Sequence, residues 1–464
     1  MDNRYLVSEP VGRLMLKYSV PCVISLLVGA LYNIVDQIYI GWGVGYLGNG
    51  ATNVVFPLTV AALAVATMIG DGACTFVSLS LGSGDRESAH RAVGNAVVLS
   101  LLCSLILTAV YFLFMDDILR LFGATQQNIS YARDYFTYIA MGVPFYMFTN
   151  AVNPIIRSDG SPRFAMLTTL AGAILNVGFD AIAVLVLGWG VAGAAIATVA
   201  GQVVSAALSL AYLFRMKTMK LHGGSFVPRP ALTGRFVPMG FCSFLSQISV
   251  VVSMAATNNM LVEYGSLSEY GEDIPLTVLG IVMKVFQIVI SVSIGMAAGC
   301  IPVVGYNIGA GRRDRALEIM RKLLVSETVL GLVSLVVVEV FPSQLIGLFG
   351  SEDELYMQFA VLTFRIYLSM IVLACVNKAS FIFLQSMGKA GLSTFLSLLR
   401  EVILGVPLVM ILPAFFGLRG VLYSMPLADI LAFAASAAVI VYTHRRLASA
   451  PAAVPAELSA QPAE

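Results

Sequence analysis

The sequence predicts an all-α polytopic membrane protein with twelve transmembrane helices, arranged as two six-helix lobes around a central cavity. Its composition, its long apolar runs and an internal repeat carry this prediction. Of its 464 residues, 58% are hydrophobic and 11% are charged, whereas a soluble domain is roughly 25% charged. The net charge of +1 leaves no basic surface for nucleic acid. These values exclude an ordinary soluble enzyme, a disordered chain and a nucleic-acid binder.

Long apolar runs follow one another along the whole chain. A spanning helix needs about 20 mostly apolar residues, and porin-like barrels would show shorter, alternating segments instead. The bilayer is therefore a predicted partner. The twelve predicted spans lie near 15–40, 53–79, 92–114, 131–156, 164–187, 191–214, 237–262, 274–303, 320–341, 356–384, 391–416 and 421–442.

The basic residues predict the orientation of the spans. Twenty Lys and Arg residues fall in the loops on one side, and only Arg120, Arg133 and Arg419 fall on the other. Because cytoplasmic loops carry the excess of basic residues, both termini are expected in the cytoplasm and the chain in the cell (inner) membrane. We expect it to act as a monomer.

The two halves of the chain resemble each other. Leu81–Glu87 (LGSGDRE) matches Ile308–Asp314 (IGAGRRD) at an offset of 227, and further matches keep this register. Each half holds six predicted spans, so both insert with the same polarity and form a parallel repeat of the kind found in transporters that work by alternating access. The predicted parts are an N-terminal lobe at 1–214, a cytoplasmic linker at 215–236, a C-terminal lobe at 237–446 and a disordered cytoplasmic tail at 447–464.

Charged side chains inside the predicted spans each need a physical reason. A charge at the centre of a bilayer costs at least ~2.5–3.5 kcal/mol on insertion scales. The predicted spans contain Asp36, Asp71, Asp180, Glu327, Glu339, Glu401, Asp429, Lys284, Arg365, Lys378 and Arg400.

Asp180 has the most clearly defined surroundings. Asn176 precedes it by one helical turn, and the predicted hairpin turn at Trp189 places Thr198 at the same depth, roughly 13 Å from the turn. Carboxylate, amide and hydroxyl oxygens together suit Na⁺ or a shared proton. The alternative is a hydrogen-bonded triad that only ties the two helices together.

Asp36 lies in the same lobe and in the same outer half of the membrane as Asp180. Two carboxyls in one low-dielectric site titrate as a coupled unit and can exchange a proton for a cation. Alternatively, Asp36 extends to the outer interface. The cavity for the transported compound is expected to contain Asn33, Gln202, Gln247, Lys284 and Lys378, although the two lysines are equally consistent with ion pairs within their lobe.

These residues resemble the multidrug and toxic compound extrusion (MATE) family. The resemblance rests on Tyr32–Gly41 (YNIVDQIYIG), on Asn176-x-x-x-Asp180, on Gly193–Thr198 (GAAIAT) and on the repeated Gly-x-Gly turns. It implies a cation and proton site at Asp36, Asn176, Asp180 and Thr198, with Na⁺ as a candidate metal ion there, and a hinge at Pro21, the proline about which span one bends in some members.

The resemblance also implies a function. Members export small cationic, amphipathic compounds in exchange for H⁺ or Na⁺, without a cofactor and without catalysis. Some carry an acid in span seven, where this chain has Phe244–Ser249 (FLSQIS). A single coupling site in the N-terminal lobe is therefore expected.

Two other functions compete with this one. A flippase for lipid-linked precursors on the same superfamily fold would use cations such as Lys284 and Lys378 to hold a pyrophosphate, but Asp36 and Asp180 argue against it. An intramembrane enzyme has no support, because the spans contain no HExxH, GxSxG or paired DDxxD motif.

Overall fold

The chain is helical throughout the part that the structure describes. The computed structural model describes residues 5–124, 126–271, 273–347 and 354–449, and no strand occurs in these ranges. Eleven helices are long and apolar enough to span a membrane. The bent pair α14 (Glu354–Tyr367) and α15 (Ile371–Ser386), with an angle of 44° between its members, makes a twelfth. The predicted all-α membrane fold is confirmed.

The helices follow the predicted spans closely. α9 begins at Pro230, within the segment 215–236 that was expected to be a linker. α19 continues to Ser449 and so includes the start of the predicted tail at 447–464, and the rest of that tail lies outside the described residues. In chain order the remaining bounds are α1 Tyr5–Ser8, α2 Val11–Gly43, α3 Tyr46–Gly82, α4 Arg86–Leu113, α5 Met115–Leu121, α6 Ile129–Ser158, α7 Pro162–Asp180, η1 Ala181–Val186, α8 Gly190–Leu213, η2 Gly223–Phe226, α9 Pro230–Ser266, α10 Asp273–Gly299, α11 Ile301–Gly309, α12 Arg313–Val340, α13 Pro342–Gly347, α16 Ala390–Leu398, η3 Leu399–Gly405, α17 Val406–Ile411, α18 Pro413–Phe416 and α19 Leu418–Ser449.

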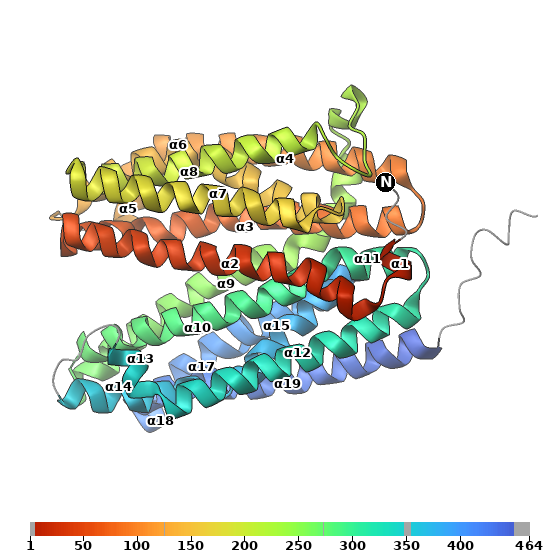
Figure 1. The fold of residues 1–464 in the computed structure, drawn as a ribbon. Helices are drawn as coiled ribbons and strands as arrows, with labels where there is room; N and C mark the ends of the chain where they lie inside the picture. Colours follow the sequence, from red (N-terminus) through yellow and green to blue (C-terminus); the bar gives the residue numbers. More distant parts are fainter. Residues whose placement is uncertain (1–4, 125, 272, 348–353, 450–464) are drawn as a thin grey trace, which may run out of the picture. The chain divides into compact units, whose positions relative to one another are not determined.

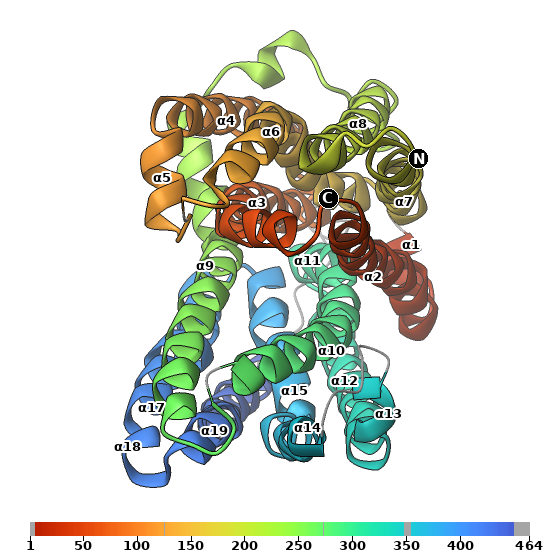
Figure 2. The ribbon, with the colours of Figure 1, turned by 90° about the vertical axis from the view of Figure 1, so that its left-hand side faces the viewer.

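Contacts divide the described helices into two compact units. Unit 1 contains residues 20–74 and 90–251, and unit 2 contains the described parts of 2–19, 75–89 and 252–464. In unit 1, α6 and α7 both pack along α8 (Figure 1). In unit 2, α15 lies among α10, α12 and α19 (Figure 2). The lobe boundaries and the central cavity predicted from the sequence remain predictions.

The internal repeat is visible in the backbone of the turns. Gly84 has φ +86° and its repeat partner Gly311 has φ +74°. In both turns the next residue donates its N–H to the carbonyl five positions back, Asp85 to Ser80 at 2.9 Å and Arg312 to Asn307 at 2.8 Å. Glycine adopts positive φ without the clash of a Cβ, so the repeated glycines specify repeated turns. Positive φ also recurs in Gly160 and Gly388 and in Gly190 and Gly417.

The hairpin of α7, η1 and α8 brings two helices into close backbone contact. A Cβ on Gly172 would lie 2.7 Å from the Gly201 carbonyl oxygen, and one on Gly201 would lie 2.5 Å from the Gly172 carbonyl oxygen. Neither position has room for a side chain. The hairpin closes at Gly188, which has φ +65°. Between α7 and this turn, the chain forms a π-helix, η1.

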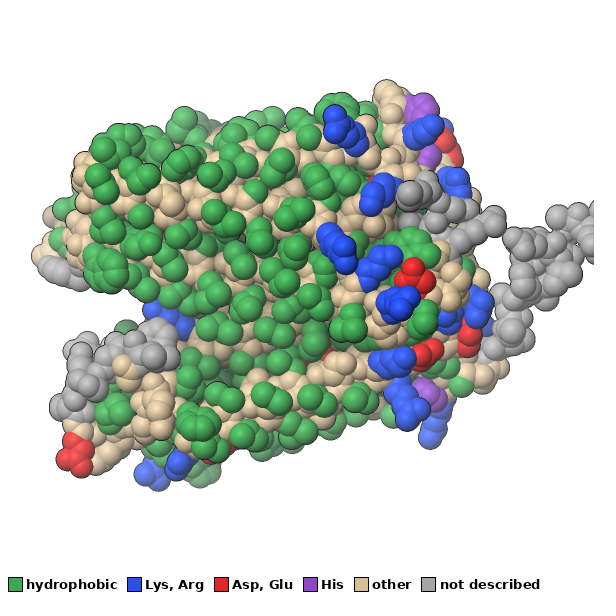
Figure 3. All heavy atoms as spheres, in the orientation of Figure 1, with side chains coloured by type: hydrophobic (Ala, Val, Ile, Leu, Met, Phe, Trp, Pro, Cys, Tyr) green, Lys and Arg blue, Asp and Glu red, His purple; other side chains and the backbone are tan. Residues whose placement is uncertain are grey.

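Apolar side chains cover the outer faces of the helices. On α12 the side chains of Val325, Val329, Val333 and Val336 are each more than half exposed. On the face shown in Figure 3, apolar side chains cover most of the helix length, and most of the Lys and Arg side chains gather near one end. An apolar band bordered by basic residues suits a helical protein in a bilayer.

Candidate functional site

The α7–α8 hairpin joins the polar residues that the sequence placed at equal depth. The Asn176 side-chain N–H donates to the Thr198 hydroxyl at 3.0 Å. Asn176 is 3% exposed and Asp180, one turn further along, is fully buried. The close packing at Gly172 and Gly201 lies within about one turn of this contact, so the small residues allow the polar ones to meet.

Asp36, on α2 of the same unit, completes this group. Its side chain is 7% exposed, and its carboxyl lies close enough to that of Asp180 for the two groups to interact electrostatically. Two neighbouring carboxylates repel each other when both are ionised, so a proton or a cation at this site stabilises the pair. The structure therefore brings together all four residues of the predicted coupling site.

Several oxygen atoms of this site lack a donor. Asp36 Oδ1, both carboxyl oxygens of Asp180 and the Asn176 side-chain oxygen have no hydrogen-bond donor among the described residues. Buried acceptors without donors are costly. Oxygen acceptors grouped in this way can bind a proton or a hard cation such as Na⁺.

Tyr135 also belongs to this site and was missed by the sequence analysis. It lies on α6, is 8% exposed, and interacts electrostatically with Asp36, Asp180 and Tyr32. No motif marks it, because it is one aromatic residue in an apolar span. Only the fold places α6 against α8 and so brings Tyr135 towards the carboxyls.

Other charges in unit 1 form a second network, beside Pro21. The Ser243 hydroxyl donates to Asp71 at 2.9 Å, and an Asp71 carboxyl oxygen lies 3.9 Å from the Arg157 guanidinium. Arg157 also donates to the Cys22 sulfur at 2.5 Å. Arg157 lies at the end of an apolar run, so the sequence did not mark it as a buried charge. This network compensates Asp71.

In unit 2, buried opposite charges pair with one another. Lys378 Nζ lies 3.2 Å from Glu401 Oε1, Arg400 also contacts Glu401, and Arg400 Nη2 lies 3.2 Å from an Asp429 carboxyl oxygen. Two cations and two anions leave the cluster neutral, which a buried group of charges requires. Lys378, expected in the cavity, is 4% exposed and lies in this cluster. Arg365 and Glu339 form a more exposed pair at 3.8 Å.

The remaining residues predicted for the cavity or hinge lie as follows. Asn33 is exposed and donates to the Gly29 carbonyl at 2.8 Å. Gln202, Gln247 and Lys284 are half-buried. Pro21 is buried within α2, which continues through it as one helix. Their roles in a cavity or in bending remain predictions.

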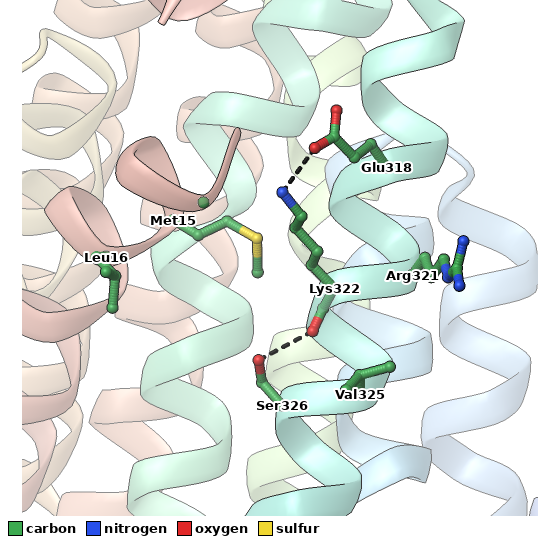
Figure 4. A pocket seen from close by; sticks show the side chains of 8 residues that line it. Met15, Leu16, Glu318, Arg321, Lys322, Val325 and Ser326 are labelled. Carbon is green, nitrogen blue, oxygen red and sulfur yellow. Dashed lines mark hydrogen bonds and ion pairs between the residues drawn. The ribbon is translucent and has the colours of Figure 1, made fainter. Parts of the chain in front are cut away.

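A groove of about 590 Å³ lies in unit 2, away from these residues. Met15 and Leu16 of α2 form one wall, and Arg321 and Lys322 of α12 form another (Figure 4). Lys322 is paired with Glu318 at 2.6 Å. None of the predicted site residues lines this groove.

Twelve apolar helices with uncompensated carboxyls among them are typical of membrane transporters, in which such groups mark ion pathways. Comparison with protein families confirms this class. The MatE family model matches residues 21–182 and 243–411, and the chain belongs to this family of multidrug efflux transporters.

Two proteins named as multidrug export proteins align with most of this chain. Multidrug export protein MepA of Staphylococcus aureus (strain MSSA476) is 24% identical over 445 residues, which cover 95% of this chain and 96% of the relative. MepA of Staphylococcus saprophyticus is 24% identical over 449 residues, with the same coverage.

Solved structures share the fold. A MATE crystal structure in the straight conformation has a TM-score of 0.89 and is 23% identical, covering 97% of this chain and 100% of that one. A MOP superfamily transporter from Pyrococcus furiosus has a TM-score of 0.90 and is 22% identical, covering 97% of this chain and 99% of that one.

Proposed function

We propose that this chain is a secondary antiporter that exports cationic, amphipathic compounds in exchange for inward H⁺ or Na⁺ by alternating access. The observation that carries the proposal is the meeting of the Asp36 and Asp180 carboxyls in a buried site. Such a pair can lose a proton when a cation arrives, because the second negative charge is then compensated. The description of the relatives as multidrug export proteins supports this class of cargo.

The proton is the first candidate for the coupling ion in this proposal. Two buried carboxyls can share one proton, which relieves their mutual repulsion, and Asn176 already uses its N–H on Thr198. Na⁺ remains the second candidate, because the same oxygens are suitable ligands for it. In this proposal both termini are cytoplasmic, the protein lies in the cell (inner) membrane, and the monomer is the working unit.

The experiment that tests the proposal is transport of a fluorescent cation, such as ethidium, in proteoliposomes. A pH gradient and a Na⁺ gradient are imposed separately, with Asp36→Asn protein as the control. Accumulation driven by one gradient, and lost in the variant, is the expected result. Equal transport with neither gradient would contradict antiport.

Flipping of a lipid-linked pyrophosphate is the competing function. It needs free cationic groups in a cavity, and Lys378 is paired with Glu401 in the structure. A scrambling assay with a labelled polyprenyl pyrophosphate in the same vesicles distinguishes the two functions. Gradient-independent movement of that lipid, without cation transport, would favour the flippase.

A further inference from the structure

Glu327 is a buried acid that the coupling site does not use. It lies on α12 in unit 2 and its side chain is 0% exposed. Neither of its carboxyl oxygens has a hydrogen-bond donor among the described residues, and it forms no ion pair there. The intramembrane acids Asp71, Glu339, Glu401 and Asp429 all face a cation. Glu327 therefore differs from these acids of the predicted spans.

Its position along the helix makes an ionised form especially costly. α12 runs from Arg313 to Val340, so Glu327 lies about 20 Å from either end at 1.5 Å per residue. This is the middle of a membrane span, where an unpaired charge is least favourable.

Glu327 lies on the face of α12 that packs against α15. Leu323, Glu327, Gly331 and Ser334 lie on the buried face of α12, which packs along α15. A Cβ on Gly331, one turn from Glu327, would lie 2.5 Å from the Val372 backbone. The two helices are therefore in close contact beside the carboxyl.

The groups that face Glu327 are neutral. The Ser293 hydroxyl of α10 interacts with its carboxyl, and the Cys375 thiol of α15 interacts with both Ser293 and Glu327. Cys375 also interacts electrostatically with Asp429 of α19 and Arg400 of η3, which are paired with each other. Among the described residues of α11, α13 and α14, which also pack on α12, no group interacts with Glu327.

A carboxylate in such surroundings is stable only with a bound cation or a proton. An isolated buried charge costs many kcal/mol and is avoided by neutralisation. A protonated carboxyl gains an O–H that can donate to the Ser293 oxygen. With no cationic side chain in contact among the described residues, protonation is the physically consistent state.

We propose that Glu327 is a proton-binding site of unit 2, distinct from the Asp36–Asp180 pair. It holds a proton in the conformation described here and gives that proton to water in a conformation that hydrates α12 and α15. The proposal goes beyond the single coupling site of the proposed function.

The first test asks whether Glu327 carries a proton in the folded protein. Full-length protein in proteoliposomes is treated with dicyclohexylcarbodiimide, which reacts with protonated carboxyls in apolar surroundings, and the α12 peptide is analysed by mass spectrometry. We expect an adduct on Glu327 and none on Glu318, an exposed and ion-paired acid of the same helix. An unmodified Glu327 beside a modified Asp36 would overturn the proposal.

The second test asks whether the proton is released. Glu327→Gln keeps the neutral shape, so we expect folded protein that loses the infrared C=O band of a protonated carboxyl and whose transport shows a shifted pH profile. Glu318→Gln should change neither. An unchanged band or an unchanged pH profile in Glu327→Gln would overturn the proposal, leaving a structural role only.

These results are independent of the proposed function. Asp36→Asn should abolish transport but keep the Glu327 adduct, so failure of one proposal is distinguishable from failure of the other. If Glu327→Gln does not fold, the carbodiimide adduct and the pH dependence of its formation in the wild-type protein still decide whether Glu327 binds a proton. If the adduct on Glu327 forms at the same rate during transport and at rest, this result counts against release of its proton.

Discussion

The Asn176 side-chain amide donates a 3.0 Å hydrogen bond to the Thr198 hydroxyl, which joins α7 to α8 one turn before Asp180. Since the N–H group is used in this contact, the amide oxygen is oriented away from it and has no donor among the described residues. The contact thus fixes the hairpin and at the same time presents an acceptor to the site that holds Asp180 and Asp36.

Asp36→Asn should give folded, membrane-inserted protein without gradient-driven efflux. The asparagine side chain keeps the shape of Asp36 but removes the charge that a proton or Na⁺ neutralises. The site therefore no longer binds and releases the coupling ion. Asp36→Glu should keep partial activity with a shifted pH profile. Efflux in proteoliposomes at matched protein amounts measures both. Glu339→Gln, which removes an exposed ion pair worth ~0–1 kcal/mol, is the control, and full efflux by Asp36→Asn would move the coupling role to Asp180 alone.

Asp180→Asn and Thr198→Ala should weaken ion binding more than they weaken folding. Loss of the Thr198 hydroxyl removes one hydrogen bond to Asn176, worth about 1 kcal/mol, and frees the amide to rotate. Binding of H⁺ or Na⁺ to purified protein, compared with the thermal unfolding midpoint in detergent, separates the two effects. Wild-type ion dependence in Asp180→Asn protein would mean that the group is only structural.

Gly201→Ala should impair the same site without touching a polar group. The added Cβ meets the Gly172 carbonyl oxygen at 2.5 Å, so α7 and α8 must separate, at a cost of ~1–3 kcal/mol. Asn176 and Thr198 then move apart. Ion binding should fall together with stability. Gly178→Ala, on the same hairpin with nothing near its Cβ, is the matched control and should leave ion binding unchanged; equal loss in both variants would refute the argument.

Arg400→Met should destabilise the protein far more than Lys378→Met. Arg400 contacts both Glu401 and Asp429, so its loss leaves buried anions uncompensated, at a cost of ~3–5 kcal/mol. Lys378 contacts Glu401, and after Lys378→Met this carboxylate is still paired with Arg400. Thermal unfolding in detergent measures the difference. The double variant Arg400→Met/Asp429→Leu should recover part of the stability that Arg400→Met loses. If no stability is recovered, the two charges act independently.

A cysteine at Ser266 should react with an impermeant maleimide from outside the cell, and one at Gly224 should react only after the membrane is opened. Both positions are exposed, whereas the neighbouring Ser225 is 5% exposed and is a poor reporter. Labelling in intact cells and in inverted vesicles tests the orientation inferred from the loop charges. The reverse pattern would contradict the cytoplasmic placement of the termini.

The spans and the hairpin part of the candidate coupling site were predictable because their signals are local. Runs of apolar residues define the helices, and Asp180, Asn176 and Thr198 lie on one hairpin whose turn glycines are visible in the sequence. Partners from distant spans were not predictable in this way. Lys378 meets Glu401 and Asp71 meets Arg157 only because separate helices pack together, and neither sequence spacing nor composition records which spans are neighbours.

The π-helix η1 begins directly after Asp180 and continues almost to the turn of the hairpin. Such a segment is an α-helix that has taken up one extra residue, and each residue of an α-helix turns the chain by about 100°. The direction of Asp180 relative to α8 therefore depends on the length of this segment as well as on the contacts between α7 and α8. Ile182 and Val186 are at least half exposed, so the number of residues between 181 and 186 matters more for the position of the carboxyl than the identity of these two side chains.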